Sequence, residues 1–346
     1  MKRKTRYSRI IGIAAGTLFA AAVFSQNAVA DRLEEVQKAG ILHCAVVPGV
    51  PGYAYPDASG KLVGFDIELC RAVAAAVLGD ADKVKTTKMN LPTSFGALQA
   101  GEVDIVTHRF TWTFSRDVGT GMNYTRVMVW DGQGFLVRKS LGVKSLSELS
   151  GATFCLASGS TTEANAADYF RTHNMDFKSV TFSDMKAAAQ AYNAGRCDVY
   201  STDKFGLGAR RLTFDDPSEH IILPEVISKE PISPMVAHGE DHWRDIVFWV
   251  FNALIAAEEL GITQVNVDQM RSSSINPEIQ RILGVTGKFA AKLKLSESWA
   301  YDAIKGVGNY GEIWDRHLGP NTKIGADRGL NNLWTNGGLM MSPPFR

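Results

Sequence analysis

The 346-residue sequence is poor in cysteine, and it lacks the short patterns of several common catalytic sites. None of its four cysteines forms a C-x-x-C pair, and neither H-E-x-x-H nor G-x-S-x-G occurs. These absences argue against a zinc or redox site at a cysteine pair, a zinc-protease helix and a hydrolase elbow. We therefore expect no metal and no cofactor.

One pair of histidines could still bind a metal, because two histidines four residues apart can face a metal from one helix turn. His238 and His242 have this spacing. The alternative, which we adopt, is that Asp241 caps the following helix and that both histidines are exposed.

Long apolar runs are also scarce, and the clearest one stands near the beginning. IIGIAAGTLFAAAVF (residues 10–24) follows five basic residues and precedes Ala28-Val29-Ala30. This order predicts a secretory signal peptide over residues 1–30, cleaved after Ala30, and hence an exported protein. A membrane anchor is the alternative, but fifteen apolar residues are short for a span.

The chain without this segment has no excess of basic charge. Taking its five basic residues from 37 leaves 32 against 36 acidic residues, a net charge of −4. This balance argues against nucleic acid as a partner.

The rest of the chain alternates between strand-like and helix-like runs. ILHCAVV, KVKTTKM and VDIVT are separated by helical patterns, and the order restarts with ATFCLAS, SVTFSD and CDVYSTD. Such alternation predicts two α/β lobes, each with a mostly parallel sheet. We expect a first lobe over 31–136, a second over 137–233, and a return crossing with a mainly helical C-terminal part over 234–346. The two crossings would form a hinge.

The four cysteines allow three disulfide pairings, or four free buried thiols. Each lobe holds two of them, and an exported chain favours disulfides. We predict Cys44–Cys70 and Cys155–Cys197, one in each lobe.

Three polar clusters follow strand-like runs, where open parallel sheets bind ligands. TWTFSRD (Thr111 to Asp117) follows VDIVT and offers an arginine fork for a carboxylate. Ser158 to Glu163 opens a helix whose N-terminus favours an anion. Asp203 ends a strand and can pair with an ammonium group. Each alone is better explained as a solvated arginine or a helix cap. Because all three stand at equivalent strand ends, together they suit the zwitterion of an α-amino acid.

The order of these clusters resembles the periplasmic solute-binding proteins of polar amino-acid ABC importers. The resemblance rests on Gly64-Phe65-Asp66-Ile67-Glu68, Thr113-x-x-Arg116, Gly159-Ser160-Thr161 and Asp203. It is strongest with the general L-amino-acid-binding subfamily, through TWT-x-SRD, DGQGFLVRKSLGVKS, AGRCDVY-x-TD, GNYGE and the SPPFR end. It implies a two-lobed, type II Venus-flytrap fold with a mainly helical C-terminal extension, acting as a monomer with an inner-membrane permease.

The resemblance also implies roles for individual residues. Arg116 would hold the ligand's α-carboxylate with help from Thr111 and from the backbone and hydroxyl of Thr161, and Asp203 would hold the α-ammonium. Ser160 would also contact the ligand. Tyr53 is our candidate for an aromatic ring that stacks on the ligand.

Arg109 departs from the subfamily, which usually has asparagine before the TWT motif. It either favours an acidic ligand side chain or points to solvent, and the sequence leaves both open.

An enzyme on the same fold is the competing function, because some periplasmic dehydratases resemble amino-acid binders. It would need a free acid or base in the cleft. Asp203 is committed to the ammonium, so we predict a binding protein and no catalytic residue.

Overall fold

The computed structural model describes residues 31–346, so the predicted signal peptide and its cleavage site lie outside the described residues. Within the described part, no helix is both long and apolar enough to cross a membrane.

The first lobe is built on a five-stranded sheet with the order β4-β1-β5-β14-β6. Strands β4, β1 and β5 are parallel, and β14 runs antiparallel to both of its neighbours, β5 and β6. The strands are β1 (Leu42–Val46), β4 (Val84–Lys88), β5 (Ile105–Val106), β6 (Met122–Tyr124) and β14 (Met235–Ala237). The predicted strands of this lobe therefore occur where the sequence places them.

Helices cover both faces of this sheet because neighbouring strand residues point to opposite sides. In β5, Ile105 belongs to the core beneath α2 (Phe65–Leu78), whereas Val106 belongs to the cluster beneath α3 (Leu91–Gln99). Helix α2 is buried almost all round and ends at Gly79 in a left-handed conformation, which glycine adopts at little cost. A shorter helix, α1 (Arg32–Ala39), precedes the sheet.

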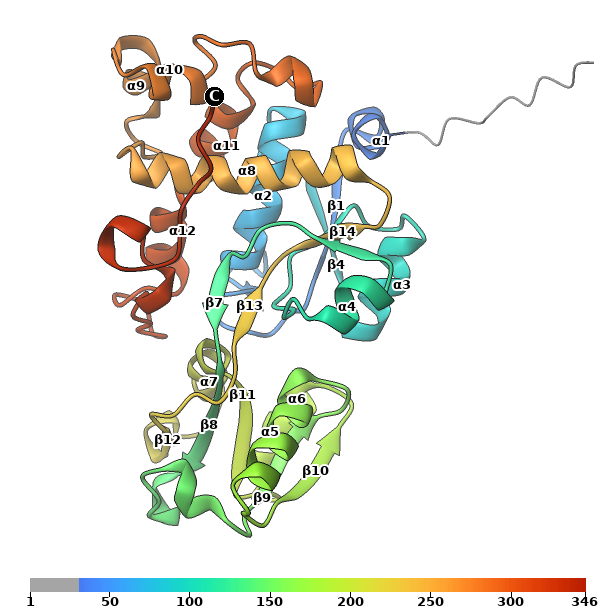
Figure 1. Cartoon of the computed structure of the whole chain (residues 1–346), viewed down its shortest axis with the longest axis vertical. Coiled ribbons are helices and arrows are strands. Elements are labelled where there is room, and N and C mark those ends of the chain that lie inside the picture. The colour runs from blue at the N-terminus through green and yellow to red at the C-terminus, as the bar shows by residue number, and fades with distance from the viewer. Residues whose placement is uncertain (1–30) are drawn as a thin grey trace, which may run out of the picture. The chain divides into compact units, whose positions relative to one another are not determined.

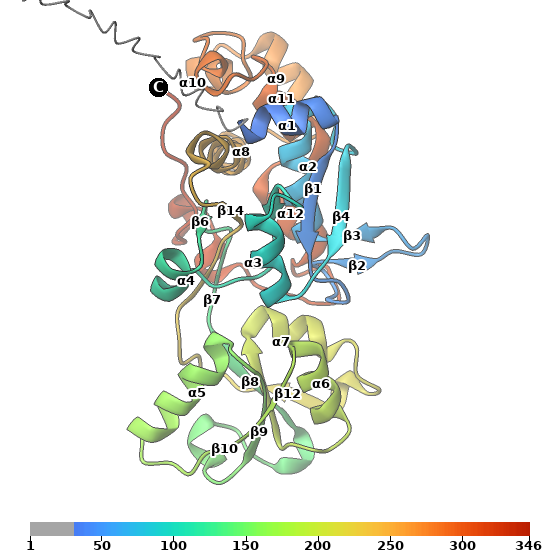
Figure 2. The same ribbon diagram turned by 90° about the vertical axis from the view of Figure 1, so that its right-hand side faces the viewer.

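The second lobe repeats this design with a sheet of order β10-β9-β11-β8-β12. Its strands are β8 (Gln133–Arg138), β9 (Thr153–Ala157), β10 (Lys178–Phe182), β11 (Val199–Asp203) and β12 (His220–Ile222). The side chains of β8 alternate between two clusters, Phe135 toward α5 (Thr161–Thr172) and Leu136 toward α6 (Met185–Asn193) and α7 (Lys204–Arg211). Figure 2 shows α5 on one side of the sheet and α6 on the other.

Two short strands join the lobes. β7 (Val129–Asp131) leads into the second lobe, β13 (Glu230–Ile232) leads back, and the two pair side by side with Glu230 opposite Asp131 (Figure 1). The expected division at residue 136 falls inside β8, a few residues after β7. Another short pair, β2 (Tyr55–Pro56) and β3 (Leu62–Val63), forms a hairpin before α2.

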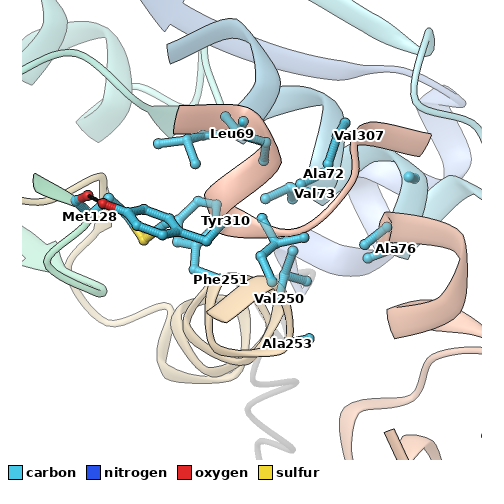
Figure 3. Packing of buried hydrophobic residues seen from close by; sticks show 14 of the residues in the cluster. Leu69, Ala72, Val73, Ala76, Met128, Val250, Phe251, Ala253, Val307 and Tyr310 are labelled. Atoms are coloured by element: carbon cyan, nitrogen blue, oxygen red, sulfur yellow. Dashed lines mark hydrogen bonds between the residues drawn. The ribbon is translucent and has the colours of Figure 1, made fainter. Parts of the chain in front are cut away.

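The C-terminal part packs against the first lobe. Helix α8 (Asp241–Glu259) lies against α2, and α11 (Trp299–Val307) and α12 (Tyr310–His317) complete one apolar core with them (Figure 3). The Tyr310 hydroxyl donates to the Met128 carbonyl at 2.8 Å, which ties this core to the residue before β7. Two further helices, α9 (Val267–Ser273) and α10 (Pro277–Ile282), lie between them in sequence.

The prediction that both histidines are exposed is confirmed for His238 and wrong for His242. His242 is only partly exposed, because its Nδ1 lies 2.5 Å from Asp31 Oδ2 and its Nε2 lies 3.1 Å from the Leu293 carbonyl. Asp241 is the first residue of α8 rather than its cap, and Glu240 stands at the cap position without a side-chain bond. No cluster of three metal-ligating side chains occurs among residues 31–346.

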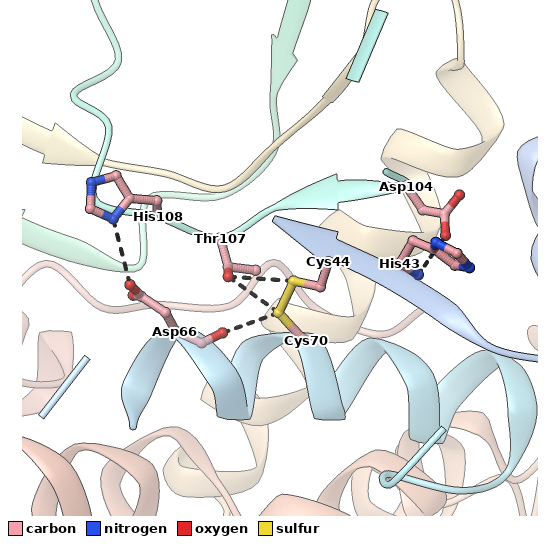
Figure 4. The surroundings of a disulfide bond; sticks show 7 residues. All are labelled: His43, Cys44, Asp66, Cys70, Asp104, Thr107 and His108. Atoms are coloured by element: carbon pink, nitrogen blue, oxygen red, sulfur yellow. Dashed lines mark hydrogen bonds and ion pairs between the residues drawn. A yellow bond between two sulfur atoms is a disulfide. The ribbon is translucent and has the colours of Figure 1, made fainter. Parts of the chain in front are cut away.

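Both predicted disulfides are present, Cys44–Cys70 and Cys155–Cys197. Each lies within one lobe, and Figure 4 shows the first between β1 and α2, beside Thr107.

The second disulfide spans 42 residues of sequence, so it restricts the unfolded chain strongly. We expect the double variant Cys155→Ser/Cys197→Ser to lose about 2–4 kcal/mol of unfolding free energy. Urea unfolding of the oxidised proteins measures this loss. An unchanged midpoint would contradict a stabilising role. A reducing agent should lower the midpoint of the wild type more than that of the variant, because the variant has only the Cys44–Cys70 disulfide to lose.

Candidate functional site

A cavity of about 490 Å³ lies between the two lobes. Residues of both lobes line it, and most of them follow the carboxyl ends of strands β1, β4, β5, β9, β10 and β11. This is the edge at which open parallel sheets bind ligands. Of the predicted site residues, the cavity is lined by Arg109, Thr111, Arg116, Ser160, Thr161 and Asp203. Tyr53 is not among the lining residues.

Arg116 reaches the cavity from α4 (Phe114–Gly119), a short helix after β5. Thr113 caps this helix by accepting a hydrogen bond from the backbone N–H of Arg116 at 3.3 Å. One guanidinium nitrogen, Nη1, donates to the Thr111 carbonyl at 3.0 Å. This bond fixes the side chain at the cavity wall, and the half-buried guanidinium remains a cationic group suited to a carboxylate.

The first turn of α5 faces Arg116 from the second lobe. Ser160 caps the helix: its hydroxyl donates to the Ala157 carbonyl at 2.7 Å and accepts from the N–H of Glu163 at 3.2 Å. The Glu163 carboxylate accepts from the N–H of Gly159 at 2.8 Å. The hydroxyl of Ser160 is thus occupied by the helix, while the positive end of the helix dipole still lies at the cavity.

Asp203 lies at the end of β11 and is almost fully buried. It does not cap the following helix. Asp131, on β7, does so instead, with its carboxylate accepting from the N–H groups of Lys204 at 3.1 Å and Phe205 at 3.2 Å. The Asp203 carboxylate is therefore available at the cavity wall.

The burial of Asp203 has an electrostatic consequence. The pKa of Asp203 is raised to about 6, because burial and the nearby Glu230 together outweigh the lowering effect of Arg109. Burial also raises the pKa of Asp131 well above its ordinary value, and the neighbouring Asp203 carboxylate adds to this rise. A cationic ligand group at this position would favour the ionised form of Asp203.

Arg109 is buried, with 5% of its surface exposed, so it does not point to solvent. Its guanidinium carbon lies 4.7 Å from the centre of the Tyr53 ring, and its Nη1 lies 4.0 Å from Asp203 Oδ2. Nε and Nη1 have no hydrogen-bond partner in the described part of the chain. A buried guanidinium with free donors is costly, which suits a site for an anionic group.

Tyr53 lies behind Arg109 and is only 1% exposed. The structure thus places its ring against the Arg109 guanidinium, at cation–π distance, rather than at the cavity surface.

Glu230 is a central residue that the sequence analysis missed. It begins β13, is 2% exposed, and accepts hydrogen bonds from side chains of both lobes. Its Oε2 accepts from the hydroxyls of Thr111 and, at 3.1 Å, Thr161. The only sequence signal was its position a few residues before the predicted return crossing, which was expected from residue 234.

Asp66 and His108 form a second buried pair (Figure 4), and His108 is one of the residues that line the cavity. His108 Nδ1 lies 3.8 Å from Asp66 Oδ2. Burial, together with Arg109, holds the pKa of His108 well below its usual range, and burial raises the pKa of Asp66 to about 7. The sequence identified Asp66 within a motif but gave it no role.

Other walls of the cavity were also missed. Met89 and Asn90 follow β4, and Asp184, Met185 and Lys186 follow β10. The rule that located the three predicted clusters, namely the ends of parallel strands, applies to these segments as well. Apolar side chains make up much of the remaining wall, namely Val47, Pro48, Val50, Phe95 and Phe110.

Comparisons with known proteins agree with this architecture. A family model described as bacterial extracellular solute-binding proteins, family 3, matches residues 42–266. The chain is 51% identical over 327 residues to the general L-amino acid-binding periplasmic protein of Rhizobium johnstonii, with 94% of this chain and 96% of that protein covered. It is 48% identical to the glutamate/glutamine/aspartate/asparagine-binding protein of Rhodobacter capsulatus, over 96% of this chain and 98% of that protein.

A solved structure is similar over nearly the whole chain. It is a periplasmic binding protein of an ABC transporter from Brucella ovis with glutathione bound, at 45% identity and a TM-score of 0.89. The similarity covers 92% of this chain and all of that chain. The C-terminal helices therefore belong to the architecture that the two proteins share.

Proposed function

This chain belongs to family 3 of the bacterial extracellular solute-binding proteins, and we propose that it captures free L-amino acids in the periplasm and delivers them to an ABC permease. It is a binding protein rather than an enzyme, as are the relatives that match it over almost their whole length. The proposal includes export by the signal peptide over residues 1–30 and action as a monomer. The residues 31–136, 137–233 and 234–346 approximate the two lobes and the returning C-terminal part.

One observation carries the proposal: groups of opposite charge face a single cavity from opposite lobes. Arg116 belongs to the first lobe, and Asp203 belongs to the second. An α-amino acid has a carboxylate for Arg116 and the N-terminus of α5, and an ammonium for Asp203. A ligand that needs both lobes binds the closed arrangement more tightly, so it shifts the population toward closure.

A larger ligand is the second candidate. The cavity of about 490 Å³ falls within the range of sites that hold whole small molecules, about 300–1,000 Å³. The Brucella ovis protein holds glutathione, a tripeptide. A peptide of this kind also carries an α-carboxylate and an α-ammonium, so the same two charged groups would serve it.

Thermal unfolding of the mature protein, stripped of ligand, separates these candidates. A ligand that binds only the folded state raises the midpoint by mass action. We expect increases with several of the common L-amino acids, and the glutathione candidate requires an increase with glutathione as well. No increase with any amino acid would contradict the proposal.

Arg109 should bias the site toward acidic amino acids. We expect Arg109→Asn to weaken the binding of glutamate and aspartate by at least about tenfold, because a hydrogen bond to a charged group contributes about 1.5–3 kcal/mol. Glutamine and asparagine should change much less. Calorimetric titration of the four ligands measures the difference, and equal losses for all four would contradict the bias.

A second variant tests Arg109 without removing its charge. A Cβ at Gly206, on α7, would lie 2.3 Å from Arg109 Nη1. Gly206→Ala should therefore displace the guanidinium and reduce the preference for acidic ligands. Gly208→Ala, on the same helix but with its new Cβ 3.7 Å from Ile324, is the matched control.

A further inference from the structure

Glu230 stands at the pivot between the lobes. It is the first residue of β13, and it pairs in register with Asp131 of β7, the other crossing strand. Only 2% of the residue's surface is exposed. A buried carboxylate needs hydrogen-bond donors to offset its lost hydration, and the donors to Glu230 come from both lobes.

The donors come from three separate segments. Thr111 of the first lobe and Thr161 of the second both donate their hydroxyl protons to Glu230 Oε2. Asn165, one turn further along α5, donates its amide to Oε1 at 2.8 Å, and Ser228 donates its hydroxyl to Oε1 at 2.6 Å. The carboxylate thus connects both cavity-lining segments to the crossing strand.

These bonds also decide what the two threonines can offer a ligand. A hydroxyl has one proton and two lone pairs. With the protons directed to Glu230, the oxygens of Thr111 and Thr161 remain as acceptors. The ligand's carboxylate then depends on Arg116 and on the N–H groups at the start of α5, that of Thr161 included, because the two threonine hydroxyls have no proton left to donate to it.

We propose that Glu230 is a positioning residue of the binding site, which holds the two lobes in the closed arrangement by binding Thr111 and Thr161 at once. The inference rests on the proposed function for its effect on affinity, but the closure itself is a property of the chain. If only the closed arrangement binds well, the apparent affinity falls in proportion to its population. Loss of the Glu230 carboxylate should therefore shift the protein toward the open arrangement and weaken ligand binding.

Solution X-ray scattering and calorimetry together test this role. We expect Glu230→Gln and Glu230→Ala to increase the radius of gyration of the ligand-stripped protein and to weaken amino-acid binding at least about fivefold. Saturating ligand should restore the wild-type radius, which a merely misfolded variant would not do. Asn165→Ala, which removes one donor outside the cavity lining, should show a smaller change in the same direction.

Glu225→Gln is the matched control, because Glu225 accepts from the N–H of Leu146 within the second lobe. It should leave both measurements as in the wild type. Wild-type radius and affinity in the Glu230 variants would overturn the proposal, and so would tighter binding, which would make Glu230 a competitor of the ligand's carboxylate. If the wild type bound no amino acid, the scattering comparison would still decide the role of Glu230.

Discussion

Replacement of Arg116 by alanine is expected to abolish amino-acid binding. The guanidinium is the cationic side chain that the short helix α4 holds at the cavity, with Nη1 anchored on the Thr111 carbonyl. Two charge-assisted hydrogen bonds to a carboxylate contribute about 1.5–3 kcal/mol each, so their loss should reduce the affinity at least about 100-fold. Calorimetric titration with a ligand of the wild type measures the loss.

Two further variants make the Arg116 result interpretable. Arg116→Lys keeps the charge but loses the planar fork, so it should bind more weakly than the wild type and better than Arg116→Ala. Arg171→Ala removes an exposed arginine that pairs with Asp168 on α5, and it should bind normally. Unchanged affinity in Arg116→Ala would show that the carboxylate is held elsewhere.

Asp203→Asn is expected to produce the second large loss. The variant keeps the size of the side chain but removes the charge that faces the ligand's ammonium. Breaking one partner of a buried charge pair costs about 2–5 kcal/mol, which corresponds to at least about 30-fold in affinity. In this variant the buried Arg109 loses the charge of its neighbour Asp203. Thermal unfolding of the ligand-stripped variant checks that the fold remains intact.

The same residue should make binding depend on pH. Burial raises the pKa of Asp203 to about 6, with Arg109 and Arg116 lowering it and Glu230 raising it. Above pH 6 the carboxylate is ionised and can hold the ammonium. Below pH 6 a proton must leave Asp203 when the ligand binds, so the affinity should fall by up to about tenfold per pH unit.

Titrations between pH 5 and 8 test this prediction. In Asp203→Asn the fall below pH 6 should disappear, and any remaining dependence belongs to other buried groups such as Asp66, with its pKa of about 7. An identical pH profile in the wild type and the variant would contradict the assignment of the ammonium to Asp203.

Local sequence patterns predicted much of the architecture. The alternation of strand-like and helix-like runs located the parallel strands, because buried parallel strands read as short apolar runs between helical patterns. The strand ends then located Arg116, the start of α5 and Asp203, and the structure places all three around one cavity. The disulfides were predictable because each lobe contained two cysteines.

Contacts between distant segments were not predictable in this way. Glu230 meets Thr111 across 119 residues of sequence and Thr161 across 69. No periodicity marks such a pair, because only the crossing strands bring them together. Arg109 was left undecided for a related reason: its burial depends on Tyr53 from one lobe and Asp203 from the other.

The central claim is that one cavity holds both charged groups of an α-amino acid. The most direct measurement is calorimetric titration of the ligand-stripped mature protein with L-glutamine, N-acetyl-L-glutamine and the α-amide of L-glutamine. The account predicts binding of the unmodified amino acid and a loss of at least about 30-fold with either blocked form. Equal affinity for all three compounds would contradict it.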